Sequence, residues 1–163
     1  MTLTLRKLVV AAALATSTVA VAAPVFAEAP IYTPKKNNVA VQGYDPVAYF
    51  TDGEPTKGTK DYKTTYMGAE FHFASQENLD TFTANPEAYA PQYGGYCAWA
   101  IADGKYAKGS AKHWAIVDGK LYLNYNRSIQ KKWNKDTAGF IERGDAQWST
   151  LQGETSEPAG YGS

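Results

Sequence analysis

The sequence predicts an α+β fold, a small antiparallel sheet of hairpins with short helices and a C-terminal amphipathic helical segment. Three observations predict this class. The dipeptide Asp118-Gly119 separates two short apolar runs, which is typical of a tight β-hairpin. Residues 70–73 alternate between polar and aromatic side chains, which indicates a second hairpin. Towards the C-terminus the apolar residues recur at helical spacing.

The first 27 residues predict a secretory signal peptide. Arg6 and Lys7 supply the positive start, residues 8–23 form an apolar run, and residues 25–27 end in a small residue suited to cleavage. The apolar run is shorter than the roughly 20 residues that a membrane-spanning helix needs. We therefore expect cleavage after Ala27 and export, to the periplasm or as a secreted protein, with no membrane contact afterwards.

The remaining chain has the length of one domain. Residues 28–38 are rich in Pro, Lys and Asn and predict a flexible leader, and residues 152–163 are rich in Gly, Ser and Glu and predict a disordered tail. The domain itself is expected at residues 39–151, and no internal repeat is visible in its sequence. The whole chain carries 16 basic and 16 acidic residues, a balance that argues against nucleic acid as a partner.

Within this domain, turn residues and apolar runs define the expected elements. Ser75 is a plausible N-cap for a helix, and Pro86 is a plausible first residue of a shorter one. The last third predicts one amphipathic helix, or two with a break near Gly139. In chain order we expect strands at 39–41 and 47–50, a hairpin at 64–73, helices at 76–84 and 86–93, a strand at 96–101, a hairpin at 113–124, and helical structure to residue 151.

Cys97 is the only cysteine of the chain. An exported protein meets an oxidising environment, and a single cysteine there indicates intermolecular pairing, a reactive thiol or a metal ligand. The alternative is a buried cysteine that serves as a small apolar side chain. Gly94 and Gly95 precede it, and their backbone amides could lower the pKa of a thiol that they face. We favour a functional thiol and keep the inert one open.

A metal site is a second hypothesis for the same residue. Cys97, His72 and His113 together offer donors that suit copper or another soft metal ion. No two of these residues have the close spacing of a metal motif. Each histidine is equally accounted for as a surface side chain.

A binding surface is a third hypothesis. Tyr44, Asp45, Tyr96 and Trp99 lie in the part of the chain that is richest in aromatic residues, and they could hold a small molecule. The alternative is that the aromatic residues build the core and that Asp45 serves the turn that precedes Pro46.

Several segments together resemble the YHS domain family in its exported form. Tyr66, His72 and Ser75 match the residues for which the family is named. Metal-handling relatives carry cysteines where this chain has Ala48 and Ala74, which argues against transferring their thiolate site. Some exported members are selenoproteins, so the resemblance implies sulfur or selenium chemistry at the position of Cys97. The family has no settled enzymatic activity to transfer. The resembling segments are residues 39–50, 73–75, 89–98 and 116–124.

The sequence therefore predicts an exported small domain with a functional thiol at Cys97, which binds a copper-type metal or has a redox role. The alternative is a non-catalytic module that binds a small molecule or a protein through a Tyr/Trp-rich face, with an inert buried cysteine. An enzyme ranks last. The expected partner is a small ligand or a metal ion, and no particular protein partner is indicated.

Overall fold

The computed structural model describes residues 29–152, so the expected signal peptide (1–27) and nearly all of the expected tail lie outside the described residues. The α+β prediction is confirmed, with the hairpins forming two separate two-stranded antiparallel sheets. The elements in chain order are the 3-10 turn η1 (Ala40–Gly43), α1 (Ala48–Thr51), β1 (Thr59–Tyr66), β2 (Ala69–Phe73), α2 (Gln76–Ala84), α3 (Pro86–Tyr89), the 3-10 turn η2 (Gln92–Gly95), α4 (Ala98–Ala102), β3 (Ser110–Val117), β4 (Lys120–Asn124), α5 (Arg127–Trp133) and α6 (Thr137–Leu151).

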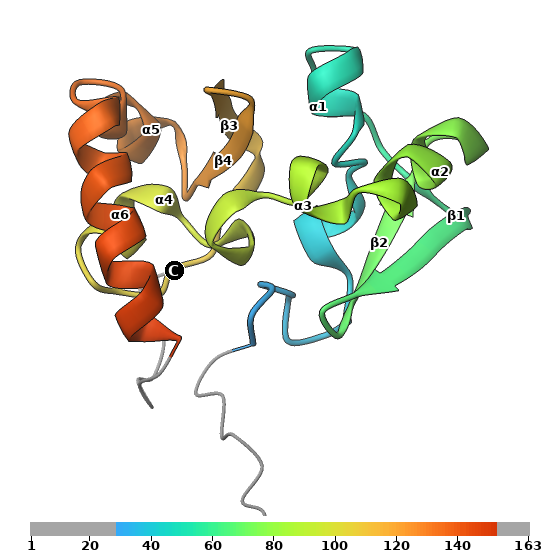
Figure 1. Cartoon of the computed structure of the whole chain (residues 1–163), viewed down its shortest axis with the longest axis horizontal. Coiled ribbons are helices and arrows are strands. Elements are labelled where there is room, and N and C mark those ends of the chain that lie inside the picture. The colour runs from blue at the N-terminus through green and yellow to red at the C-terminus, as the bar shows by residue number, and fades with distance from the viewer. Residues whose placement is uncertain (1–28, 153–163) are drawn as a thin grey trace, which may run out of the picture.

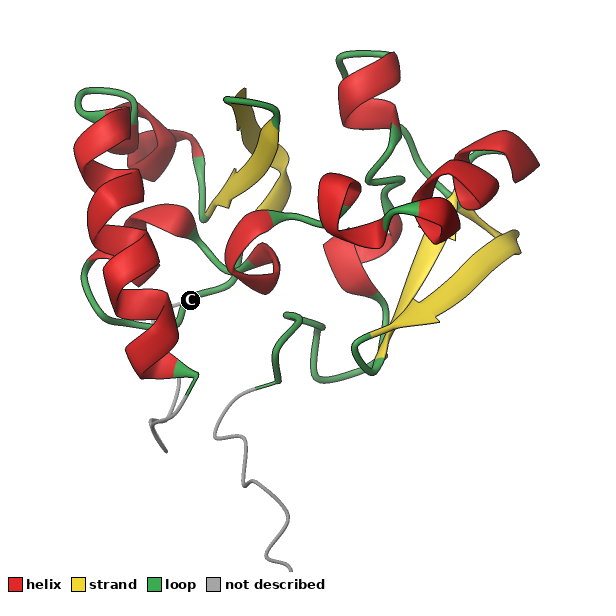
Figure 2. Ribbon diagram, in the orientation of Figure 1, coloured by secondary structure: helices red, strands yellow, loops and turns green. Residues whose placement is uncertain are grey.

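These elements form two successive units with the same internal order. We call the segment from η1 to α3 the first unit and the segment from η2 to α6 the second unit. Each contains a 3-10 turn, a short helix, an antiparallel hairpin and two further helices. The two units lie side by side, with α3 between them (Figure 1), and the same succession of strands and helices is visible in both (Figure 2). The expectation that the domain has no internal repeat was therefore wrong.

The two hairpins agree in detail. β1 and β3 each have 8 residues, and β2 and β4 each have 5. Both pairs contain a register shift after the first residue of the longer strand, between Thr59 and Lys63 and between Ser110 and Trp114. Both hairpin turns place two residues at positive φ, Met67-Gly68 in one and Asp118-Gly119 in the other. A bulge and a turn that recur together at the same register indicate one repeated structure.

The helices that follow the hairpins also correspond. Ser75 caps α2 by accepting a hydrogen bond from the N–H of Asn78, and Asn126 caps α5 in the same way, 51 positions later. Phe82 and Trp133 are separated by the same interval, and both are buried. The units differ at their ends, because α3 stops after 4 residues whereas α6 continues for 15 and packs on α4.

Two segments expected as strands are α-helices, and the strand expected at 39–41 lies largely in the 3-10 turn η1. Residues 47–50 fall largely in α1, and residues 96–101 fall largely in α4. Short apolar runs do not by themselves distinguish a strand from a buried helix. Alanine favours the helix in both places, and each helix is followed by an Asp-Gly pair whose glycine has a positive φ, at Gly53 and Gly104.

The two units share a core and a polar clamp. Phe71, Phe73 and Phe82 of the first unit belong to one apolar cluster with Leu121 and Leu123 of the second. The clamp is the side-chain amide of Gln42, whose Nε2 donates to the carbonyl oxygen of Gly109 at 3.0 Å and whose Oε1 accepts from the N–H of Ala111 at 2.7 Å. The Tyr49 hydroxyl donates to the carbonyl oxygen of Ala111 at 2.7 Å.

The described part of the expected flexible leader is packed across both units. Ile31 is only 4% exposed, and the N–H of Tyr32 donates to the carbonyl oxygen of Gly94 in the second unit at 2.8 Å. The carbonyl oxygen of Asn38 accepts from the N–H of Glu70 in the first unit at 2.8 Å. Parts of the expected leader, at Ile31, Tyr32 and Asn38, are therefore held against the two units. Within residues 29–152, no helix has the length and apolar character needed to cross a membrane.

The paired glycines Gly58 and Gly109 provide a test of the repeat. A Cβ at Gly58 would overlap the backbone of His72 and Phe73, and a Cβ at Gly109 would overlap the backbone of Gly95. We expect Gly58→Ala and Gly109→Ala each to lower the free energy of unfolding by about 3 kcal/mol or more, because backbone must move in both cases. Urea denaturation measures this free energy.

The control for this test is Gly68→Ala, in a hairpin turn where an added Cβ meets nothing within 4 Å. Its positive φ alone should cost about 1 to 2 kcal/mol. Losses at Gly58 or Gly109 no larger than at Gly68 would contradict the close backbone approach.

Candidate functional site

Cys97 is buried at the junction of η2, α4 and β4. Cys97 is 1% exposed, and its Sγ accepts a hydrogen bond from the N–H of Tyr125 at 3.2 Å. The Sγ also lies 3.8 Å from the Oδ1 of Asn124, which is completely buried. Next to the sulfur is an apolar pit of about 10 Å³, the size of one water molecule, lined by Cys97, Trp99, Ala100, Ala107, Tyr125 and Ile129.

Asp45 occupies the corresponding place in the first unit. It is completely buried, and its carboxylate accepts four hydrogen bonds. Oδ1 accepts from the N–H groups of Val47 at 2.8 Å and Ala48 at 3.3 Å. Oδ2 accepts from the N–H of Ala74 at 2.8 Å and from Nδ2 of Asn78 at 2.7 Å. Because all four of these bonds are internal, Asp45 serves the fold in this structure.

The correspondence of Cys97 with Asp45 follows from the backbone. The N–H of Asp45 donates to the carbonyl oxygen of Thr56 at 2.9 Å, and the N–H of Cys97 donates to that of Ala107 at 2.8 Å. Each residue follows a tyrosine that leaves a 3-10 turn, and each precedes a short helix. The amide of Tyr125, which donates to the sulfur, lies 51 positions after the amide of Ala74, which donates to the carboxylate.

The protonation of Cys97 reflects two opposing effects. Burial raises the pKa of its thiol, and this is the larger effect. The backbone N–H groups of Ala100, Tyr125 and Trp99 act in the opposite direction, because they favour the thiolate. The thiol is therefore neutral at neutral pH, although it lies among donors that suit an anion.

The expected metal site of Cys97, His72 and His113 does not form. Among residues 29–152, no three His, Cys, Asp or Glu side chains come together in a way that could hold a metal ion. His72 belongs to β2 of the first unit, where its Nε2 lies 2.7 Å from Oε1 of Glu70. His113 belongs to β3 of the second unit. The nearest polar neighbours of the sulfur are an amide oxygen and backbone N–H groups, so the residues at Cys97 do not fit a copper ion.

Glu70 joins His72 to a lysine. Its Oε2 accepts from Nζ of Lys63 at 2.8 Å, and the hydrogen bonds from Lys63 and His72 lower the pKa of the Glu70 carboxyl. His72 also lines an open pocket of about 370 Å³ together with Lys57 and Lys60.

The three aromatic residues expected on a binding face have structural contacts. Lys57 places its Nζ 3.9 Å from the centre of the Tyr44 ring. Tyr96 is 4% exposed, and its hydroxyl donates to the carbonyl oxygen of Ala29 at 3.0 Å. Trp99 is half-buried and lines the pit beside Cys97. Tyr44 and Tyr96 occupy equivalent positions in different units, each directly after a 3-10 turn.

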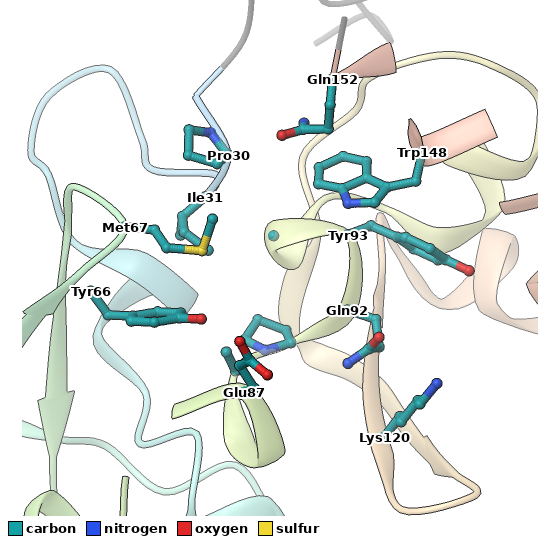
Figure 3. Close-up of a pocket in the computed structure, with 13 residues that line it drawn as sticks. Pro30, Ile31, Tyr66, Met67, Glu87, Gln92, Tyr93, Lys120, Trp148 and Gln152 are labelled. Atoms are coloured by element: carbon teal, nitrogen blue, oxygen red, sulfur yellow. The ribbon is translucent and has the colours of Figure 1, made fainter. Parts of the chain in front are cut away.

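A cleft of about 360 Å³, close in volume to the pocket beside His72, lies where the two units meet. Figure 3 shows Tyr66 and Met67 from the first unit on one side and Tyr93 and Trp148 from the second unit on the other. Pro30, Ile31, Gln92 and Gln152 also line it, as do the exposed charged residues Glu87 and Lys120. The size falls within the range of small-molecule sites, which often lie between two structural units.

Sequence reasoning missed this cleft. Its walls come from the leader, the first hairpin turn, η2, β4 and the end of α6, which are far apart in the chain. Tyr66 was singled out only through the resemblance to a family. Without knowledge of the repeat, the sequence contains no pattern that brings these segments together.

The structural role of Asp45 can be tested by Asp45→Asn. The amide would present a donor to groups that already donate and would remove the charge that three backbone N–H groups face. We expect the free energy of unfolding to fall by about 2 to 4 kcal/mol. Thermal and urea denaturation measure it, with the exposed Asp52→Asn as the control. A loss no larger than that of Asp52→Asn would contradict the role.

The raised pKa of Cys97 predicts a loss of stability at alkaline pH. Because the folded thiol has a higher pKa than the unfolded thiol, its stabilising contribution is complete below the unfolded pKa of about 8.5 and is lost as the pH rises through the folded value. Buried tyrosines act in the same direction, so the measurement is the difference between the native protein and Cys97→Ala in urea denaturation. We expect the native protein to lose more stability above about pH 9. Parallel pH profiles would show that burial leaves the thiol unperturbed.

Comparison with known proteins gives one match. No curated protein and no solved structure matched the chain. The model of the YHS domain matches residues 47–93, which run from just before α1 to the start of η2 and thus cover most of the first unit. The second unit from Gly94 onwards lies outside the match. Residues 47–93 of this chain are therefore similar to the YHS domain.

Proposed function

We propose that this protein is a non-catalytic binding module that holds a small molecule in the cleft between its two units. The observation that carries the proposal is the cleft of about 360 Å³, with aromatic walls contributed by both units. Export through the segment at residues 1–27 is part of the proposal and places the ligand outside the cytoplasm.

The cleft combines a rigid wall with adaptable polar groups. The Tyr93 ring lies 5.9 Å from that of Trp148, and the Tyr93 hydroxyl donates to a carboxylate oxygen of Asp145 at 2.9 Å. A Cβ added at Gly144 would press on the Tyr93 ring, so helix α6 approaches this ring closely. Such packing fixes the wall before a ligand binds, which lowers the entropy cost of binding.

The lining also indicates the chemical class of the ligand. Tyr66 and Trp148 offer partly exposed aromatic surface, which favours a flat aromatic group. Glu87 and Lys120 offer opposite charges at the edge of the cleft, as Figure 3 shows. A small aromatic molecule with both a basic and an acidic group fits this combination better than an ion of a single charge.

Copper binding at Cys97 is the alternative that the sequence favoured. YHS domains are associated with metal binding in general. In this chain the polar neighbours of the sulfur are backbone N–H groups and the side-chain amide of Asn124. Cys97 precedes α4, whereas His72 lies on β2 and His113 on β3. The cleft is therefore the better-supported site.

NMR spectroscopy of the mature protein tests the proposal with three probe sets: aromatic amines, aromatic acids and aromatic zwitterions. We expect saturable shifts of the Trp148 indole and of the Tyr66 and Tyr93 rings, strongest with the zwitterions. The indole of Trp99, beside Cys97, is the internal reference that should not shift.

Two variants serve as controls. Trp148→Ala should weaken binding about fivefold or more, because stacking on an aromatic wall contributes about 1 kcal/mol or more. Trp99→Ala removes a tryptophan away from the cleft and should leave binding unchanged. The proposal fails if no probe gives saturable shifts at millimolar concentration, or if the shifts cluster around Trp99.

A further inference from the structure

We propose that Cys97 is an oxidation site for hydrogen peroxide, and that the cradle around it holds the resulting sulfinate as the first unit holds the carboxylate of Asp45. We use the word cradle for the backbone N–H groups of Trp99, Ala100 and Tyr125 together with the side chain of Asn124. This site is separate from the cleft and does not depend on the proposed function.

The first step of the argument is the equivalence of the two cradles. Asp45 accepts from the N–H groups of Val47, Ala48 and Ala74, so this backbone arrangement holds a buried anion in the first unit. In the second unit, the sulfur of Cys97 is held by the N–H of Tyr125, with those of Trp99 and Ala100 beside it. A sulfinate carries two oxygens on the atom attached to Cβ, as a carboxylate does, and thus offers the same acceptors.

The second step is an unused donor. Asn124 is completely buried beside the sulfur, and its Nδ2 has no hydrogen-bond partner. An unpaired buried donor costs about 1 to 3 kcal/mol, which is unusual in a native structure. The Oδ1 of the same amide lies 3.8 Å from the sulfur and accepts from the N–H of Trp99 at 3.4 Å, so an oxygen added to the sulfur would lie next to an amide that still has an unused donor.

The third step is space. In the first unit, the side chain of Asn78 donates the fourth of the hydrogen bonds that Asp45 accepts. The corresponding position of the second unit holds Ile129. Where the first unit has the contact between Asn78 and Asp45, the second unit has the pit of about 10 Å³ between Ile129 and Cys97. A pit of this size admits an oxidant close to the size of water and excludes bulky thiols or disulfides.

The chemistry balances with peroxide as the oxidant. The thiol of Cys97 first loses its proton. The thiolate sulfur then attacks one oxygen of hydrogen peroxide, an S–O bond forms and the O–O bond breaks, which gives a sulfenic acid. The leaving hydroxide combines with the proton that the thiol released, and water results. A second peroxide oxidises the sulfenate in the same way to the sulfinate. Because burial keeps the thiol protonated, we expect this oxidation to be slow at neutral pH and faster at alkaline pH.

Peroxide titration of the folded mature protein tests the proposal, with intact mass and peptide mapping as the readout. We expect Cys97 to gain two oxygen atoms and to stop there, with the protein still folded by circular dichroism. Peptide mapping is needed because the exposed Met67 also takes up oxygen. The Cys97→Ser variant should show only the methionine product. A Cys97 that stays reduced at peroxide concentrations that oxidise the unfolded protein, or that reaches three oxygens without a plateau, would overturn the proposal.

A carboxylate placed in the cradle gives a second test without peroxide. Cys97→Asp puts a carboxylate where Asp45 has one, so we expect it to fold with a melting temperature close to that of Cys97→Ser. Ala107→Asp is the matched control, because Ala107 lines the same pit and is 5% exposed but lies outside the cradle. It should unfold or lose much more stability. Equal destabilisation by both variants would show that the cradle does not hold an anion.

Discussion

The constraint on which this structure depends is a buried acceptor for the backbone amides that meet at the start of each short helix. In the first unit the acceptor is the carboxylate of Asp45, which joins the start of α1 to the end of β2 and to α2. In the second unit it is the sulfur of Cys97, which joins the start of α4 to the end of β4. Buried amides without an acceptor are costly, so neither position tolerates a purely apolar side chain without loss.

Because this arrangement occurs in both units, the two units can pair, and their pairing positions the shared core and the cleft. The clamp of Gln42 on Gly109 and Ala111 fixes one unit against the other, and the shared core of phenylalanines and leucines fills the space between them. The cleft lined by Tyr66 and Trp148 is a consequence of that pairing, because its two walls belong to different units. The proposed binding cleft and Cys97 therefore lie at different points of one repeated scaffold.

The sequence predicts the hairpins and the helix caps, but not the two short helices α1 and α4 or the repeat. The Asp118-Gly119 hairpin and the Ser75 cap were predicted correctly because their signals are local. The repeat was missed because equivalent core positions carry different chemistry, with Asp45 matched by Cys97 and Phe82 by Trp133. A weak signal exists, since Asp52-Gly53 recurs 51 positions later as Asp103-Gly104. The separate positions of the two histidines and the cleft also escaped prediction, since both depend on how distant segments pack.

The most direct test of the cradle is amide hydrogen exchange at Tyr125 in the native protein and in Cys97→Ala. The amide of Ala74, which donates to Asp45, is the internal reference in both samples. If the sulfur is the acceptor for Tyr125, its removal should speed exchange at Tyr125 about tenfold, as expected for a lost buried hydrogen bond, and leave Ala74 unchanged. Unchanged exchange at Tyr125 would contradict the account, because Cys97 would then not occupy the place that Asp45 has in the first unit.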